Sequence, residues 1–419
     1  DVVPAQVNAY AAPQRLALCV EGLPLTLPDR KEEKKGPRVD APEKAIDGFL
    51  RANQLDNVAA LSVREDKKGA FYVLEIDEPG RPLAEALSDF LPEMISGFQW
   101  LKSMRWGDGS LRWVRPLRAI LCMLDGQIVP FEVEGLRSGE TSFGHRFMAP
   151  AALPIAHAKD YLGTLEKAFV LADAPVREAM VMEGASALAK SVGCTLVEDS
   201  GLMRETAGLV EWPVPLLGAI DAAFMDVPEE VLVSVMRTHQ KYFALRTADG
   251  KLAPYFITIS NIETPDKGAA IVNGNQRVLR ARLSDGRFFW DQDRKETLHS
   301  RLPALEKVTF QAKLGTVREK AERISKLAET LAPVLGADAA LSAQAGQLAK
   351  ADLTSGMVYE FPELQGIMGG YYAAHDGLGE VVAAAIRNHY SPQGPDDAIP
   401  ETAEGRAVAL ADKLDMLAG

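Results

Sequence analysis

The sequence predicts an α+β protein in which a mixed body of strands and helices is followed by a helical domain. Short apolar runs bounded by Gly, Pro or charged residues, which are typical of strands, lie before residue 263. From about Lys267 onward, apolar residues recur at helical spacing instead. This change of period places a boundary near residues 300–310, and we expect domains at 1–150, 151–303 and 304–419.

The first part of the chain mixes strand and helix signals. The predicted strands are 14–25, 71–77, 112–123 and 127–133. The predicted helices are 42–54, 83–99 and two or three within 158–193. The polar stretch 31–38 is interrupted by Gly36-Pro37, so we expect an exposed loop there.

A hairpin and a series of helices complete the predicted elements. The apolar runs 242–246 and 255–262 flank Asp249-Gly250, and an Asp-Gly pair between two strand signals predicts a hairpin. The predicted helices that follow are 267–297, 303–332, 338–359, 378–390 and 404–418.

The charge balance of the chain is acidic. Lys and Arg number 46 against 58 Asp and Glu, for a formal net charge of −12 over 419 residues. A protein held to nucleic acid by its overall field usually shows the opposite balance, so such contacts must come from local basic patches. No apolar run approaches the roughly 18 residues of a membrane helix, and we expect no membrane partner. The three cysteines form no metal-ligand spacing, which favours the cytoplasm.

Residues 102–118, the basic segment, form the first such patch. They contain five Lys or Arg, one Asp and two Trp, a local charge of +4. Arg beside aromatic residues is the composition that binds phosphates and stacks on bases, so Arg105, Arg112 and Arg115 are candidate RNA contacts. Strand alternation would place Arg112 with Val114 on one face and Trp113 with Arg115 on the other. The alternative is a surface strand with structural tryptophans.

A second basic cluster lies within 274–295. Arg277 and Arg280 share one helical face, and Arg282 with Asp285 form an i,i+3 pair. Charge networking within the protein explains this alternation of Arg and Asp as well as RNA binding does, so both hypotheses stay open. In Thr238-His-Gln-Lys-Tyr-Phe, Lys241 is a further candidate RNA contact, and His239 fits either substrate contact or a structural hydrogen bond.

The C-terminal helices carry His and Asp residues at spaced positions, namely Asp352, His375, His389 and Asp412. This spacing is similar to the HD metal-dependent phosphohydrolases, in which His and Asp ligands hold a divalent ion that activates water. Ala351 stands where such a domain would have the His of its His-Asp pair, so we expect a degenerate site without a working metal. The chain contains no phosphate-binding P-loop, dinucleotide-binding, nucleophile-elbow or HExxH motif.

Five strings spread over nearly the whole chain carry a family resemblance. They are Lys102-Ser-Met-Arg-Trp-Gly, Thr238-His-Gln-Lys-Tyr-Phe, Asn275-Gln-Arg-Val-Leu-Arg-Ala-Arg-Leu-Ser-Asp, Glu360-Phe-Pro-Glu-Leu-Gln-Gly-Ile-Met-Gly and Leu410-Ala-Asp-Lys-Leu-Asp. Together they resemble the beta subunit of bacterial heterotetrameric glycyl-tRNA synthetase. Compared with that family, we expect this chain to lack a short N-terminal segment and everything beyond Gly419, including an anticodon-binding region.

The resemblance implies a fold and a division of labour. The first body would be similar to part of the phenylalanyl-tRNA synthetase beta chain, and the helical domain would be HD-like. The alpha subunit of an alpha2beta2 tetramer would hold the ligase active site, with ATP and Mg, and this chain would position tRNA(Gly). The chain itself would then have no catalytic residue and no cofactor, and it would not be catalytic alone. The alternative is an HD-type phosphohydrolase that acts on nucleotides or RNA 3′ ends.

Overall fold

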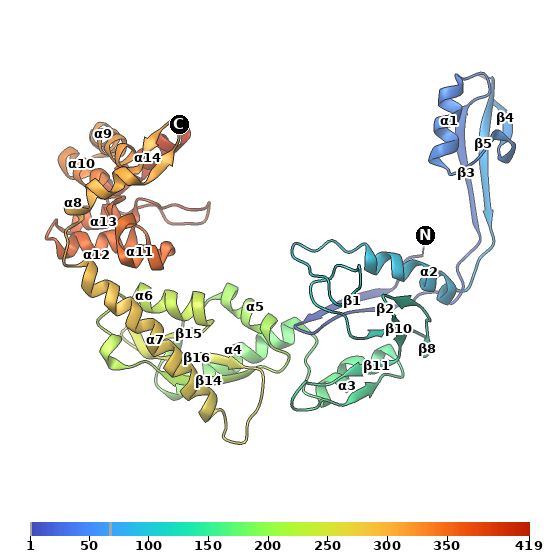
Figure 1. Cartoon of the computed structure of the whole chain (residues 1–419), viewed down its shortest axis with the longest axis horizontal. Helices are drawn as coiled ribbons and strands as arrows, with labels where there is room; N and C mark the ends of the chain where they lie inside the picture. Colours follow the sequence, from blue (N-terminus) through green and yellow to red (C-terminus); the bar gives the residue numbers. More distant parts are fainter. Residues whose placement is uncertain (1, 67–68) are drawn as a thin grey trace. The chain divides into compact units, whose positions relative to one another are not determined.

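The computed structural model describes residues 2–66 and 69–419, and the chain forms two compact units, Asp1–Arg177 and Glu178–Gly419 (Figure 1). The mixture of helices with several small sheets confirms the α+β class. The predicted domain boundaries at 150/151 and 303/304 stay predictions. Among the described residues, no helix combines the length and the apolar character needed to cross a bilayer.

The first unit begins with an antiparallel hairpin of β1 (Gln6–Ala12) and β2 (Arg15–Glu21). Tyr10, Ala17 and Cys19 on one face of this hairpin pack against a small core that includes Tyr161 and Leu165 of α3 (Tyr161–Lys167). The remaining elements of this unit outside the next sheet are α2 (Leu83–Ser96), β6 (Ile120–Leu121), β7 (Met123–Leu124), β8 (Gln127–Ile128), β9 (Glu132–Val133), β10 (Leu136–Gly139), β11 (Thr141–Phe143) and β12 (Ala152–Pro154).

The prediction of a loop at 31–38 is wrong, because these residues form most of β3 (Arg30–Arg38). This strand pairs with β5 (Gly69–Glu78), whose other edge pairs with β4 (Ser62–Asp66). The helix α1 (Glu43–Ala52) contacts β3 of this sheet. Ion pairs across the strands, Lys35 with Asp66 at 2.8 Å and Lys31 with Asp77 at 3.6 Å, balance the lysines. Both partners lie far along the chain, so no local pattern could indicate them.

The second unit contains a four-stranded sheet in the order β13 (Thr195–Leu196), β15 (Phe243–Arg246), β16 (Leu252–Ser260) and β14 (Val214–Ala219). The predicted hairpin is confirmed as β15–β16, and Gly250 takes a φ of +82° in its turn. Phe243 and Leu245 join one buried cluster with α4 (Ala174–Ser191) and α5 (Ser200–Leu209). Ala244 joins another with α6 (Glu229–Ser234) and α7 (Ala269–Asp293), so helices cover both faces.

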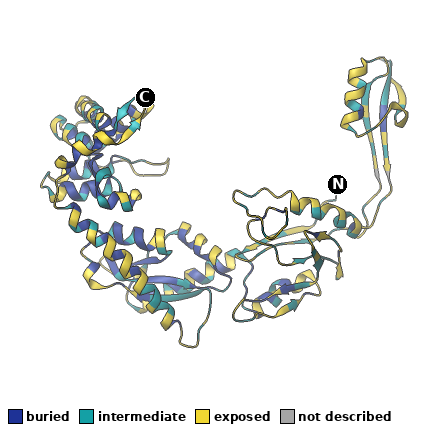
Figure 2. Cartoon of the chain, viewed as in Figure 1, coloured by how far each residue is buried: buried dark blue, intermediate teal, exposed yellow. Residues whose placement is uncertain are grey.

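Helices make up most of the rest of this unit, and Figure 2 shows the buried interior between them. They are α8 (Leu298–Arg301), α9 (Val317–Leu335), α10 (Ala339–Leu348), α11 (Gly356–Glu360), α12 (Ile367–His375), α13 (Glu380–Asn388) and α14 (Ala403–Ala418). The helix predicted to begin near 303 begins only at Val317, after the strands β17 (Thr309–Gln311) and β18 (Gly315–Thr316) in the sequence. It begins there because Thr316 and Glu319 form a capping box.

Asp293 at the end of α7 ties several of these helices together. Its Oδ1 accepts from Gly356 N at 2.9 Å and lies 3.2 Å from Arg301 Nη2, while its Oδ2 accepts from Met357 N and Tyr372 Oη, each at 2.9 Å. Asp293 and Arg301 are both buried. A hydrophobic cluster extends from Ile220 to Ala411 around this hub, so the sheet and the helices share one interior.

Candidate nucleic-acid interface

All five cations of the basic segment are exposed in the first unit, namely Lys102, Arg105, Arg112, Arg115 and Arg118. In the described part of the chain, no ion pair is formed by any of them, whereas Arg81, Arg287 and Arg318 each pair with a carboxylate. The segment therefore presents a cluster of charges that the fold itself does not neutralise. Phosphate groups are the ligands that such exposed guanidinium groups bind best.

Two backbone hydrogen bonds between Met104 and Trp113 close the segment into a loop. Met104 N donates to Trp113 O at 2.8 Å, and Trp113 N donates to Met104 O at 3.2 Å. Trp113 is buried, with its ring 4.8 Å from Trp100 and 5.4 Å from Phe98, centroid to centroid. Trp113 is thus a structural residue, which matches the structural alternative for this residue, and it is not open to stack on a base.

Glu134 fixes the tip of the same loop from a neighbouring turn. Its carboxylate accepts from Ser110 Oγ at 2.8 Å, Ser110 N at 3.1 Å and Leu111 N at 2.9 Å. These hydrogen bonds, led by that of the Ser110 hydroxyl, lower the pKa of Glu134. The Glu134 carboxylate therefore stabilises the loop, and its oxygens accept hydrogen bonds from the loop instead of pairing with the nearby arginines.

The candidate arginines of this loop differ in the hydrogen bonds that their side chains form. Arg112 Nε lies 3.3 Å from Ser103 Oγ, and one Arg115 Nη donates to its neighbour's carbonyl, Val114 O, at 2.8 Å. Arg105 and Arg112 adjoin the two bridge residues, which brings them to the same part of the loop. The predicted alternation is wrong for Arg115, which is exposed although Trp113 is buried, because 114–119 is not a strand.

The cluster on α7 has a different character, because its charges are largely used within the protein. Arg280 Nε lies 3.4 Å from Asp221, and Arg282 lies 4.0 Å from Glu360 rather than pairing with Asp285. Lys241 Nζ lies 2.8 Å from Glu205. In the described residues, Arg277 is the candidate on this helix without an ion pair. The internal charge network is therefore the better description of α7.

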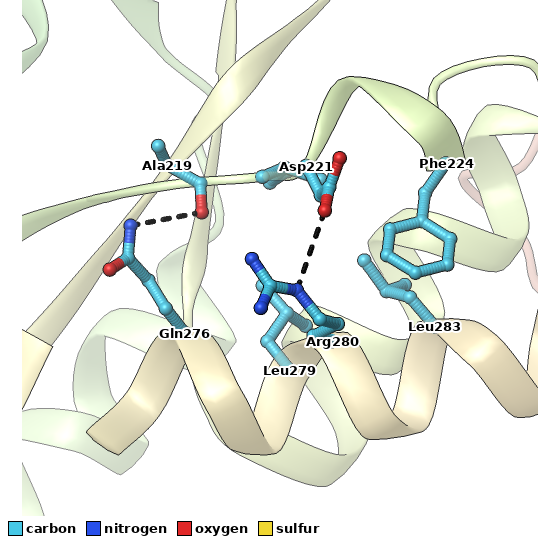
Figure 3. Close-up of a pocket in the computed structure, with 8 residues that line it drawn as sticks. Ala219, Asp221, Phe224, Gln276, Leu279, Arg280 and Leu283 are labelled. Atoms are coloured by element: carbon cyan, nitrogen blue, oxygen red, sulfur yellow. Dashed lines mark hydrogen bonds and ion pairs between the residues drawn. The ribbon is translucent and has the colours of Figure 1, made fainter. Parts of the chain in front are cut away.

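Arg280 also borders a small pocket between α7 and the end of β14, with a volume of about 130 Å³ (Figure 3). Phe224, Leu279 and Leu283 supply apolar walls. Gln276 Nε2 donates to Ala219 O at 3.3 Å at its other end. Because the Arg280–Asp221 pair crosses the pocket, its polar groups are already engaged with one another.

His239 lies in a π-helical turn, Val235–Gln240, that precedes β15. Its ring packs edge-on against Phe361, with centroids 5.6 Å apart. This aromatic contact of an exposed ring ties the turn to the loop after α11, and neither of the two roles predicted for His239 is tested by it.

The HD-like positions separate into two groups. His389 and Asp412 are buried and meet at Lys350, whose Nζ lies 2.9 Å from His389 Nε2 and 2.9 Å from Asp412 Oδ2. His375 is exposed at the end of α12. Asp352 is buried, and its Oδ2 accepts from the backbone of Gly366 at 2.6 Å and Gly369 at 2.9 Å.

Two lysines of this buried cluster, Lys320 and Lys350, are site residues that the sequence did not predict. Lys320 Nζ lies 2.9 Å from Asp412 and 3.0 Å from Asp415. A signal for it existed, since Lys320 stands among Val317, Ala321 and Ile324 on the apolar face of α9. No comparable signal marks Lys350, whose role depends on residues about 40 and 60 positions further along the chain.

This chain is similar to known proteins of one family. The family model for "Glycyl-tRNA synthetase beta subunit" matches residues 1–419. A glycine–tRNA ligase beta subunit of Paracoccus denitrificans (strain Pd 1222) is 50% identical over 98% of this chain and 61% of the relative. Those of Phenylobacterium zucineum (strain HLK1) and Ruegeria sp. (strain TM1040) are 50% and 49% identical, each over 99% of this chain and 62% of the relative.

The chain therefore spans about three fifths of the length of these relatives. The match to the family model extends across both compact units. The chain belongs to the glycyl-tRNA synthetase beta subunit family.

Proposed function

We propose that this chain is the part of a glycine–tRNA ligase beta subunit that holds tRNA(Gly), and that the basic segment binds its phosphates. The observation that carries the proposal is the group of five exposed cations that no acid of the described chain neutralises. Arg105, Arg112 and Arg115 are the principal contacts. Arg277 adds a charge on α7 that forms no ion pair within the described residues. Arg280, Arg282 and Lys241 are secondary contacts whose ion pairs would have to open.

In this proposal the chain contributes position rather than bond chemistry. A partner alpha subunit, in an alpha2beta2 tetramer in the cytoplasm, activates glycine with ATP and Mg. The beta subunit presents the terminal hydroxyl of the tRNA to the activated glycine, and correct placement of two reactants lowers a barrier by about 7–11 kcal/mol at most. The chain has no catalytic residue or cofactor of its own in this scheme and is not catalytic alone.

The two parts of the chain resemble domains of other proteins in this scheme. The strand-containing part, 1–303, is similar to part of the phenylalanyl-tRNA synthetase beta chain, and 304–419 is an HD-like domain. Support for the second comes from the way Asp412 of α14 and His389, directly after α13, meet in the interior. The phosphohydrolase alternative is not favoured, because a lysine occupies the point at which these two side chains meet.

A charging assay tests this function. The full-length beta subunit, mixed with the alpha subunit, should attach glycine to tRNA(Gly), and neither subunit should do so alone. The variant R105Q/R112Q/R115Q should raise the KM for tRNA with little change in the KM for glycine. R280Q/R282Q is the matched control, with the smaller effect expected from arginines already paired. Charging of another amino acid, or an unchanged KM for tRNA in the first variant, would contradict the proposal.

A further inference from the structure

The buried charge cluster of the second unit has the donor set of a metal site but a lysine at its centre. His389 Nε2 and Asp412 Oδ2 are ligand types that divalent ions prefer, and both point at one position. That position is occupied by Lys350 Nζ, 2.9 Å from each. Lys350 and His389 are almost completely buried.

His389 is oriented as a metal-ligating histidine is. Its Nδ1 lies 2.6 Å from the backbone carbonyl of Ile386, so Nδ1 carries the proton and donates, and Nε2 offers its lone pair. Metal-ligating histidines are oriented by this kind of second hydrogen bond. Burial, reinforced by the charge of Lys350, lowers the pKa of His389 to about 3, so the ring is neutral at physiological pH.

Asp412 is likewise positioned from behind. Lys320 Nζ lies 2.9 Å from its Oδ1, which leaves Oδ2 directed at Lys350. Lys320 also contacts Asp415, and Arg323 Nε lies 2.5 Å from the same Asp415 carboxylate. The cluster thus contains three cations and two carboxylates, and each cation lies within hydrogen-bond reach of at least one carboxylate.

The ammonium of Lys350 is satisfied at this position. Besides its two hydrogen-bond partners, Nζ lies 3.7 Å from the centre of the Tyr390 ring, a distance typical of a cation–π contact. A buried ammonium without such partners would lose its proton or destabilise the fold. Burial lowers the pKa of Lys350 to about 8, and the charge and hydrogen bond of Asp412 oppose this shift.

Among the described residues, no third His, Cys, Asp or Glu joins His389 and Asp412 as a metal ligand at this point. Asp352 gives one carboxylate oxygen to two backbone N–H groups at the start of α12. Its neighbour Ala351 has no donor atom. Across the described residues, no group of three or more His, Cys, Asp or Glu is arranged to hold a metal ion. A zinc ion binds such ligands at about 2.0–2.2 Å and would have to displace the ammonium.

We propose that Lys350 is a built-in cation that takes the place of a divalent metal ion in the centre of this helical region. The lysine links the end of α10, α13 and α14 through His389 and Asp412. The region therefore keeps its central positive charge at any metal concentration. This inference is independent of the RNA-binding proposal.

Cobalt(II) binding tests the inference, because the visible spectrum of Co2+ reports nitrogen and oxygen ligands. The wild-type protein should bind no Co2+ through His389, and its melting temperature should not change when EDTA is added. Lys350→Ala removes the ammonium and opens space between the two ligands. This variant should bind one equivalent of Co2+, and its melting temperature should rise with Co2+ concentration until the site is full.

Two matched variants make the result specific. Lys350→Met also removes the charge but fills the space, so it should bind no Co2+. His389→Gln in the Lys350→Ala background should abolish the spectrum and the shift in melting temperature. If Lys350→Ala does not fold without metal, recovery of its folding by Co2+, and not by added salt of the same ionic strength, supports the inference. Metal binding by the wild-type protein that His389→Gln abolishes, or a folded Lys350→Ala without Co2+ binding, would overturn it.

Discussion

The basic segment makes a quantitative prediction about the salt dependence of tRNA binding. Each protein cation that contacts a phosphate releases condensed counterions, so log K falls with log salt by about 0.7–0.9 per contact. R105Q/R112Q/R115Q removes three exposed cations that form no ion pair in the described structure, so the slope should become shallower by about 2–3. Between about 50 mM and 200 mM salt, the affinity ratio of wild type to variant should therefore shrink by about 20–40-fold.

The measurement is a filter-binding titration of full-length protein with tRNA(Gly) at several salt concentrations. R280Q/R282Q controls for charge removal as such, since Arg280 and Arg282 face Asp221 and Glu360, and its slope should change less than half as much. Substitutions of exposed side chains usually change stability by less than about 0.5 kcal/mol, and thermal unfolding checks this. Equal slopes for wild type and R105Q/R112Q/R115Q would refute the assignment of the RNA surface.

Three further predictions concern single carboxylates and a histidine. Asp293→Ala removes the buried carboxylate partner of the buried Arg301, whose other carboxylate partner, Glu296, is exposed and 3.7 Å away. This change should lower the free energy of unfolding by about 3–5 kcal/mol, as measured in urea, and Asp293→Asn should be less harmful. Folding lowers the pKa of His389 from 6.5 to about 3, so between these pH values the unfolded chain binds a proton that the folded chain does not. The free energy of unfolding should therefore decrease as the pH falls from about 6.5 to about 3, and it should decrease less steeply in His389→Gln. Glu134→Ala should loosen the loop at Ser110 and speed its amide exchange, with Glu132→Ala as the control.

The helical half of the fold could be predicted because its signals are local. The apolar spacing in 267–297 and 404–418 is a property of neighbouring residues, and α7 and α14 follow it closely. The Asp-Gly turn of β15–β16 is local as well. By contrast, α12 was not predicted, since Gly369 and Gly370 weaken the helical signal. Their small size lets α12 approach Ile386 and Arg387 of α13, which is a tertiary contact.

The sequence by itself determined the family, the α+β class and the two basic clusters. Tertiary structure decided which cations remain free to bind a phosphate. An ion pair such as Arg280–Asp221 joins residues far apart in the sequence, so no periodic pattern of residues predicts it. It also turned the polar stretch at 31–38 into a strand through partners on β5 and β4. The same reason applies to Lys350, because its hydrogen-bond partners His389 and Asp412 come from other segments and meet it only in the folded chain.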